Sequence, residues 1–360
     1  MRRSVKLAAV VLSGSLGIAS LAACGAKSTD NSTASAGASG SGLKVGMAYD
    51  IGGRGDQSFN DSAARGLDKA KAQLGVTVNE AEAKQGESDA DKEARLNSLV
   101  TAGFNPVIAV GFVYQPAVEK VAKANPNVKF AIIDSSSDTQ PSNVTSLTFS
   151  EQEGSYLAGV AAALKSKTKH VGFIGGVQTE LIKKFEAGYR AGVASVDQNI
   201  KVDVKYLTTP PDFTGFADPA KGKSAAQGML DNGDDVIYSA AGSSGSGAIE
   251  AVYTEWSTNH KDVWAIGVDS DQANQPALAK YKDRILTSMV KNVDTAVYTY
   301  INSVKTGSPL TGVKNFDLKQ GGVSLATTGG HIDDIKKQLD DATAKITQGA
   351  TTVPTAPPAG

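Results

Sequence analysis

The sequence predicts an α/β protein in which two doubly wound parallel-sheet domains face each other across a ligand cleft. Three observations lead to this prediction. The chain of 360 residues has room for two domains of about 150 residues each. Short apolar runs alternate with longer amphipathic stretches, a pattern typical of parallel sheets covered by helices on both faces. The second half of the chain also repeats the pattern of the first.

The expected strands are short apolar runs, and the expected helices carry apolar residues at helical spacing. We expect strands at residues 44–49, 76–80, 106–110, 129–133, 170–174, 201–206, 235–239, 263–268 and 285–290. We expect helices at residues 61–74, 90–102, 154–164, 181–196, 220–231 and 247–256, and a last helix that begins at residue 331.

The internal repeat relates the two expected domains. Val45, Phe59 and Gly66 in the first half have counterparts at identical spacings in Val171, Phe185 and Gly192 of the second half. The run from Phe130 to Ser135 similarly resembles the run from Trp264 to Ser270. Matches in the same order indicate two similar α/β domains related by a pseudo-twofold axis.

The amino terminus predicts export and a lipid anchor. Residues 1–23 have the basic and then apolar character of a signal peptide, and the apolar run is too short to span a bilayer. Cys24, the only cysteine, lies in Leu-Ala-Ala-Cys-Gly, which resembles the lipobox of bacterial lipoproteins. An ordinary signal peptide with an incidental cysteine is the alternative. Lipid on Cys24 would hold the chain at the extracytoplasmic face of the cell membrane.

The remaining boundaries follow from composition and from the repeat. Residues 24–42 are expected to form a lipidated flexible tether, and residues 349–360, which contain several prolines, a disordered tail. The amino-terminal α/β domain is expected to comprise residues 43–148 plus about 292–318, and the carboxyl-terminal domain residues 149–291 plus about 319–348.

Composition argues against several classes of function. The formal net charge of −1 offers no electrostatic attraction for nucleic acid. The three histidines are not at metal-ligand spacing and a second cysteine is lacking, so we expect no metal site. A glycine-rich phosphate loop is also missing, so any ATP would be handled by a partner. We expect no cofactor and no catalytic residue, because the histidines lie away from the predicted cleft.

Ligands of open α/β sheets bind beyond the carboxyl ends of the strands. Asp50, Asp134, Gly242 and Asp269 each stand at or just after the end of an expected strand, so we expect them to line the cleft. Each aspartate could instead cap the helix that follows.

Five segments resemble a known family, the basic membrane lipoprotein family of nucleoside-binding proteins. The most specific runs from Asp50 to Asn60 and matches the family pattern D-x-G-G-x-x-D-x-S-F-N. The supporting segments are residues 153–159, 172–176, 267–272 and 287–291, and the resemblance spans about residues 44–345. It implies the type I periplasmic-binding-protein fold and a substrate-binding lipoprotein that serves an ABC permease and its ATPase. We expect the protein to be a monomer.

The resemblance also implies a purine nucleoside ligand, of the adenosine, guanosine or inosine class. Phe59 and Phe185 would stack on the base, with Phe216 or Tyr238 as the alternative second ring. Asp50 and Gln57 would address the base edge, and Asn60 would contact the ligand or cap a helix. Asp134 and Asp269 would accept bonds from the ribose hydroxyls, Lys291 would balance these acids, and Gly242 would let the backbone approach the sugar. The positions in this sequence are Asp50, Gln57, Phe59, Asn60, Asp134, Phe185, Gly242, Asp269 and Lys291.

Two other functions remain open at this point. The same fold could bind a sugar or another small polar ligand, or act as a sensor or receptor. An enzyme such as a nucleoside hydrolase is the third possibility. Twin phenylalanines favour an aromatic ligand over a sugar, and the lack of a clustered acid–base pair argues against hydrolysis.

Overall fold

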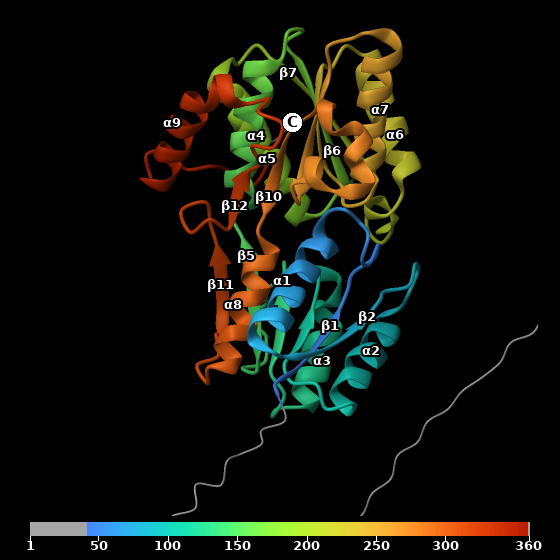
Figure 1. Ribbon diagram of the computed structural model, residues 1–360, viewed down its shortest axis with the longest axis vertical. Helices are drawn as coiled ribbons and strands as arrows, with labels where there is room; N and C mark the ends of the chain where they lie inside the picture. The colour runs from blue at the N-terminus through green and yellow to red at the C-terminus, as the bar shows by residue number, and fades with distance from the viewer. Residues whose placement is uncertain (1–41, 359–360) are drawn as a thin grey trace, which may run out of the picture. The chain divides into compact units, whose positions relative to one another are not determined.

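The structure, a computed structural model, describes residues 42–358. The expected signal peptide, Cys24 and nearly all of the expected tether lie outside the described residues. The described chain forms two lobes, each built on its own parallel-dominant sheet, as the sequence predicts (Figure 1). The doubly wound α/β prediction is therefore confirmed.

The first lobe contains a parallel sheet in the strand order β11-β5-β4-β3-β1-β2. These strands are β1 (Lys44–Ala48), β2 (Thr77–Ala81), β3 (Val107–Ala109), β4 (Phe130–Ile133), β5 (Val144–Phe149) and β11 (Gly312–Phe316). Helices α1 (Phe59–Leu74) and α8 (Val293–Lys305) pack together, as do α2 (Asp89–Thr101) and α3 (Gln115–Ala124) (Figure 1). Alternate residues of the central strands enter two separate hydrophobic clusters, so both faces of the sheet are covered.

The second lobe contains a sheet in the order β12-β10-β9-β8-β6-β7, in which β12 is antiparallel to β10. Its strands are β6 (His170–Val177), β7 (Lys201–Thr208), β8 (Val236–Ala240), β9 (Trp264–Asp269), β10 (Ile285–Lys291) and β12 (Val323–Leu325). Helices α4 (Glu151–Lys165) and α5 (Glu180–Val196) form one packed pair, and α6 (Pro219–Asp231) and α7 (Ser244–Asn259) form another. Helix α9 (Lys336–Thr347) packs against α4.

The chain passes between the lobes after β5, after β10 and after β11. Strand β5 belongs to the first sheet and is followed by α4 of the second lobe, whereas β10 of the second sheet is followed by α8 of the first. Residues of these connections therefore lie beside the space between the lobes.

Some elements of the structure were not predicted from the sequence or have different bounds. Strand β5 reads VTSLTF, in which Thr and Ser interrupt the apolar run, and β11 and β12 are short edge strands. Helix α8 is rich in β-branched and aromatic residues, which are poor helix formers, and its packing against α1 compensates for this. The last helix begins at Lys336 rather than at residue 331, after a 3₁₀ turn over Asp333–Ile335.

The carboxyl-terminal segment also differs from the expectation of disorder over residues 349–360. Val353 is buried and belongs to a hydrophobic cluster that includes residues of both lobes, and the Thr351 amide donates a 3.0 Å hydrogen bond to the Lys345 carbonyl. The described part of the tail therefore packs against the fold through apolar side chains such as Val353.

Candidate ligand-binding site

The carboxyl ends of both sheets face one cavity between the lobes, which we call the interlobe cavity. Its volume is about 570 Å³, including the opening to solvent. The first lobe contributes Asp50, Ile51, Asp56, Phe59, Asn60, Gly111, Phe112 and Asp134. The second lobe contributes Leu181, Ile182, Phe185, Phe216, Ala240, Gly242, Val268, Asp269 and Lys291. A cavity at the carboxyl ends of parallel strands is a common place for a small-molecule site.

The loop from Asp50 to Asn60 is organised around Asp56. The Asp56 carboxylate accepts hydrogen bonds from the backbone amides of Ser58 (2.9 Å), Asn60 (2.8 Å) and Asp61 (3.1 Å). These amides are the unpaired donors at the start of α1. Asp56 thus anchors the amino terminus of α1, where Phe59 and Asn60 line the cavity. Burial raises the pKa of Asp56 to about 6, although the three amide bonds oppose the rise.

Asp50 is the first residue of the same loop. Its Oδ1 accepts a 2.7 Å hydrogen bond from the Ile51 amide, and the Asn60 side chain accepts one from the Asp50 amide. A side chain at Gly111 would come within 2.2 Å of Asp50 Oδ2, so only glycine leaves room for the carboxylate. Burial raises the pKa of Asp50 to about 7, despite the bond from the Ile51 amide.

Asp134 and Asp269 occupy equivalent positions in the two lobes. Asp134 follows β4, Asp269 ends β9, and both have left-handed backbone angles, with φ of 65° and 63°. Left-handed φ is uncommon outside glycine but is favoured by Asp and Asn, and it gathers at functional sites. The shared backbone geometry turns one carboxylate from each lobe into the cavity.

Lys291 is the buried cation between these acids. Its Nζ lies 2.5 Å from Asp134 Oδ2 and 3.5 Å from Glu151 Oε1, and only 1% of the residue is exposed. Burial alone would lower the pKa of Lys291, but Asp134, Glu151 and Asp269 together outweigh it and raise the pKa. Burial raises the pKa values of Glu151 and Asp269, and Lys291 opposes both shifts.

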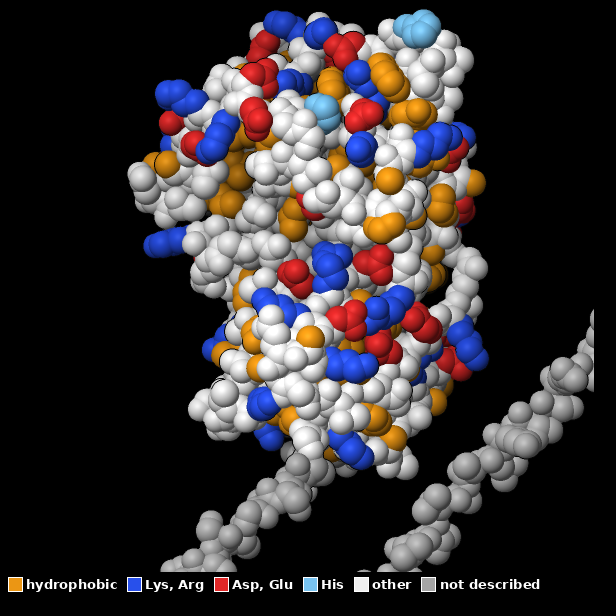
Figure 2. All heavy atoms as spheres, viewed as in Figure 1, with side chains coloured by type: hydrophobic (Ala, Val, Ile, Leu, Met, Phe, Trp, Pro, Cys, Tyr) orange, Lys and Arg blue, Asp and Glu red, His pale blue; other side chains and the backbone are white. Residues whose placement is uncertain are grey.

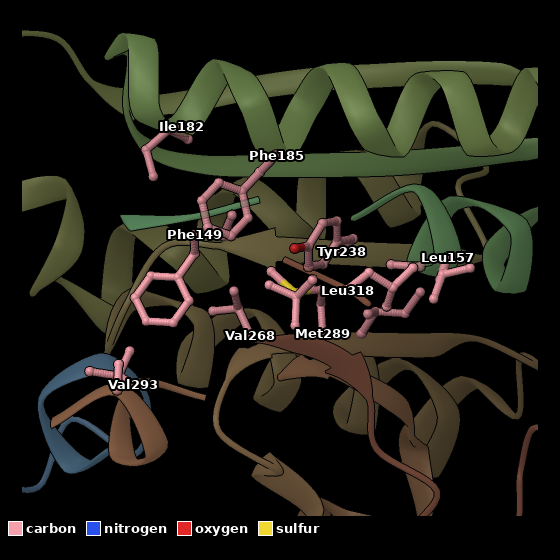
Figure 3. Close-up of a cluster of buried hydrophobic side chains, with 14 of the residues drawn as sticks. Phe149, Leu157, Ile182, Phe185, Tyr238, Val268, Met289, Val293 and Leu318 are labelled. Atoms are coloured by element: carbon pink, nitrogen blue, oxygen red, sulfur yellow. The ribbon is translucent and has the colours of Figure 1, made fainter. Parts of the chain in front are cut away.

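Three phenyl rings surround the Lys291 ammonium. The centroids of Phe59, Phe149 and Phe185 lie 4.9, 5.2 and 5.6 Å from Nζ. Phe149 and Phe185 belong to the buried cluster that also contains Tyr238, Val268 and Met289 (Figure 3). Aromatic faces attract a cation, so these rings add to the attraction that the carboxylates exert on Lys291.

The remaining cavity rings lie at the contact between the lobes. Phe112 packs edge-on against Phe216, at a centroid distance of 6.4 Å, and against Phe213, at 5.8 Å. A side chain at Gly242 would approach the Phe216 carbonyl to 2.8 Å, so glycine allows this close packing.

Most residues singled out by sequence converge on the interlobe cavity, and two do not. Gln57 is not among the lining residues, because its side chain turns back to the Gly55 carbonyl (3.0 Å) and its backbone φ is 57°. Tyr238, one alternative for the second ring, is buried in the core and hydrogen-bonded to Ser155. Phe185 and Phe216 both line the cavity.

The sequence reading missed Asp56, Gly111, Phe112 and Glu151. Asp56 stands within the motif from Asp50 to Asn60, and Gly111 and Phe112 come shortly after the end of β3, so the end-of-strand rule applied to every strand finds them. Glu151 could not be found by this rule, since it does not line the cavity but approaches Lys291, and also Lys184, from beside it.

Two sheets that present their carboxyl ends to one cavity define a bilobal binding protein with the type I periplasmic-binding-protein fold. The family model described as "ABC transporter substrate-binding protein PnrA-like" matches residues 43–356. The chain belongs to this family of ABC transporter substrate-binding proteins.

Relatives and solved structures agree with this assignment. The "ABC transporter nucleoside-binding protein BmpA" of Lactococcus lactis is 39% identical over 332 residues, which cover 87% of this chain and 89% of that protein. "Basic membrane protein A" of Borreliella burgdorferi is 34% identical over 83% of this chain and 84% of that protein. A solute-binding protein of an ABC transporter system from Aeropyrum pernix superposes with a TM-score of 0.75 at 29% identity, over 87% of this chain and 93% of that one.

The surface adds two observations. On the face drawn in Figure 2, acidic and basic side chains are interspersed, in keeping with a net charge near zero. Among the helices of residues 42–358, none is both long enough and apolar enough to cross a membrane.

Proposed function

We propose that this protein captures a purine nucleoside at the extracytoplasmic face of the cell membrane and delivers it to an ABC importer. The observation that carries the proposal is a buried acceptor in the interlobe cavity. Asp134 Oδ1 has no hydrogen-bond partner among the described residues, although Asp134 Oδ2 is paired with Lys291. A buried, unpaired carboxylate oxygen is costly, and a ligand hydroxyl would satisfy it.

The sugar end of the ligand would lie beside Asp134, Asp269 and Lys291. A ribose carries vicinal hydroxyl groups that donate to carboxylates and accept from an ammonium. Carboxylates from two lobes can hold such a pair only when the cleft is closed, so recognition of the sugar is coupled to closure.

The base would lie against the phenyl rings of the cavity. Phe59 of the first lobe and Phe185 of the second line the cavity together with Phe216. Stacking between flat rings contributes about 1–3 kcal/mol per contact. Asp50, whose carboxylate stands at the end of β1, is placed to accept from N–H groups on the base edge.

Charge favours a nucleoside over a nucleotide. Asp50, Asp134 and Asp269 line the cavity, with Lys291 as the cation that faces them. A phosphate group would add about 1.5 to 2 negative charges to this acidic space. We therefore expect a neutral ligand. The name of the Lactococcus lactis relative supports the same ligand class.

The decisive experiment is isothermal titration calorimetry with inosine, guanosine, adenosine, free hypoxanthine, ribose and inosine 5′-monophosphate. We expect at least one nucleoside to bind much more tightly than its free base, its sugar or its monophosphate. Chromatography after long incubation should return intact nucleoside. Ribose binding as tightly as any nucleoside would favour a sugar-binding protein, and catalytic release of free base would indicate an enzyme.

Anchoring is tested separately through Cys24. If lipid on Cys24 holds the protein at the membrane, Cys24→Ser should move it to the soluble fraction after detergent-free fractionation. Nucleoside affinity of the released protein should be unchanged, because residue 24 precedes the folded body. Membrane association that persists in the variant would contradict the lipoprotein assignment.

A further inference from the structure

A second cluster of polar side chains lies in the second lobe at the end of the sheet opposite the interlobe cavity. His170 is the first residue of β6, Asp203 is in the first half of β7, and Asp234 lies in the loop just before β8. Because the strands are parallel, their amino-terminal ends meet at one edge of the sheet. One ring nitrogen of His170 and one oxygen from each carboxylate lie within 4.8 Å of one another.

Asp234 is the member of this cluster whose burial its surroundings do not explain. The residue is 1% exposed, and neither carboxylate oxygen has a hydrogen-bond partner within residues 42–358. Burial raises the pKa of Asp234 to about 6, and His170 opposes the rise. A buried carboxylate without donors is destabilising unless a cation or a donor is supplied.

The ring nitrogen of His170 lies close to both carboxylates without a hydrogen bond to either. Its Nε2 lies 3.0 Å from Asp203 Oδ2 and 3.8 Å from Asp234 Oδ1. Despite the short distance to Asp203, this buried nitrogen makes no hydrogen bond in the described part of the chain. Two ligands of a tetrahedral ion with bonds of about 2.0–2.1 Å stand about 3.3 Å apart, and their lone pairs point to the ion instead of to each other.

We propose that His170, Asp203 and Asp234 form a binding site for a divalent transition-metal cation such as Zn²⁺. Imidazole with two carboxylates suits a borderline cation, whereas Mg²⁺ and Ca²⁺ prefer six or more oxygen ligands. The side chains of His170 and Asp203 are partly exposed, which leaves a coordination position for water. The bound cation would join β6, β7 and the loop before β8.

The sequence predicts no metal site, and the reason is clear from the fold. Only parallel strand pairing brings residues 170, 203 and 234 together, so no local spacing reveals the cluster. The inference is independent of the proposed nucleoside function, since the site lies at the opposite edge of the sheet.

Lys201 provides a specific test of the proposed metal site. Its ammonium lies 2.9 Å from Asp203 Oδ1, and 62% of the Lys201 side chain is exposed. This charge competes with a metal for the same carboxylate. Removing it in Lys201→Gln should strengthen metal binding, a change that a purely structural ion pair would not produce.

The test is calorimetric titration of the chelator-treated full chain with Zn²⁺, and with Co²⁺ as a spectroscopic probe. We expect one Zn²⁺ per chain, visible absorption from Co²⁺ bound to nitrogen and oxygen, and a rise in the thermal midpoint of unfolding with Zn²⁺ that Mg²⁺ does not reproduce. His170→Asn and Asp203→Asn should each weaken Zn²⁺ binding by more than about tenfold, because even outer-shell partners of metal ligands contribute about 10–100-fold.

His260→Asn is the matched control, since His260 is an exposed histidine at the carboxyl end of α7. It should leave Zn²⁺ affinity unchanged, and nucleoside affinity should be the same in all of these variants. Absence of saturable Zn²⁺ binding would overturn the proposal. Zn²⁺ binding that survives both His170→Asn and Asp203→Asn would also overturn it, by assigning the metal to other residues.

Discussion

Ser58 Oγ donates a 2.7 Å hydrogen bond to Asp269 Oδ2, and this bond joins the two lobes beside the interlobe cavity. It is part of a small interlobe set. Ser270 Oγ donates to the Ser58 carbonyl at 2.7 Å, and Gln272 Nε2 donates to the Gln57 carbonyl at 3.1 Å. Gln57 therefore contributes to the closed cleft through its backbone. Because lobe opening must break these bonds, they oppose ligand release.

The first prediction concerns this connection. Ser58→Ala removes the donor to Asp269 and should increase the rate of nucleoside release about fivefold, since a hydrogen bond contributes about 1 kcal/mol net. Stopped-flow displacement with a competing nucleoside measures this rate. Ser98→Ala, on the exposed side of α2, is the control and should leave the rate unchanged. Equal release rates in both variants would show that the Ser58 bond does not limit opening.

The second prediction concerns the stacking rings. Phe59→Ala should weaken nucleoside binding by about 1–3 kcal/mol, and so should the variant of whichever ring, Phe185 or Phe216, forms the opposite wall. Leucine variants separate stacking from burial, because leucine keeps apolar volume but offers no flat face. If Phe59→Leu binds as tightly as the parent in calorimetry, the ring does not stack on the base.

The acids that line the cavity could be predicted from the sequence, because the topology of a parallel sheet brings the residues at the ends of its strands together. Asp134 and Asp269 follow apolar runs that are visible in the sequence, and parallel pairing then carries them to the same cavity. The orientation of Gln57 could not be predicted in this way, since it depends on a left-handed backbone angle set by Asp56 and Asp61. Glu151 was equally hidden, because its partner Lys291 is distant in sequence and meets it only where the chain passes between the lobes.

The third prediction concerns the sugar end. Asp134→Asn keeps the shape of the side chain but removes the charge that pairs with Lys291 and accepts from the ligand, so binding should weaken by about 1.5–3 kcal/mol. A 2′-deoxynucleoside should bind the parent protein less tightly than the ribonucleoside does. If Asp134 holds the 2′-hydroxyl, that difference should shrink in Asp134→Asn. An unchanged difference would assign the 2′-hydroxyl to another group, with Asp269 as the next variant to measure.

Glu151→Gln gives a contrast to the third prediction. Glu151 approaches Lys291 but does not line the cavity. Its removal should therefore weaken nucleoside binding less than Asp134→Asn does, and to the same degree for ribose and deoxyribose ligands. A loss confined to the ribonucleoside would mean that Glu151 contacts the sugar directly.

The last prediction concerns pH and Asp50. Burial raises the pKa of Asp50 in the folded protein from 3.8 to about 7. Between these values the folded protein keeps a proton that the unfolded chain has released. The contribution of Asp50 to the free energy of unfolding therefore falls as the pH rises from about 4 to about 7, and levels off above that. Asp50→Asn should remove this part of the pH dependence in denaturant titrations, and a variant that kept the full slope would assign it to other buried acids such as Asp56.

The pH dependence of nucleoside affinity should also distinguish inosine and guanosine from adenosine. An ionised Asp50 accepts from the N1–H of inosine or guanosine, whereas adenosine presents an acceptor at N1. Inosine affinity should thus rise by up to about tenfold between pH 6 and pH 8, as a group with a pKa near 7 ionises, while adenosine affinity should not. Calorimetry at both pH values measures this, with Asp50→Asn as the variant in which inosine loses its pH dependence. Parallel profiles for the two nucleosides would show that Asp50 does not address the N1 edge of the base.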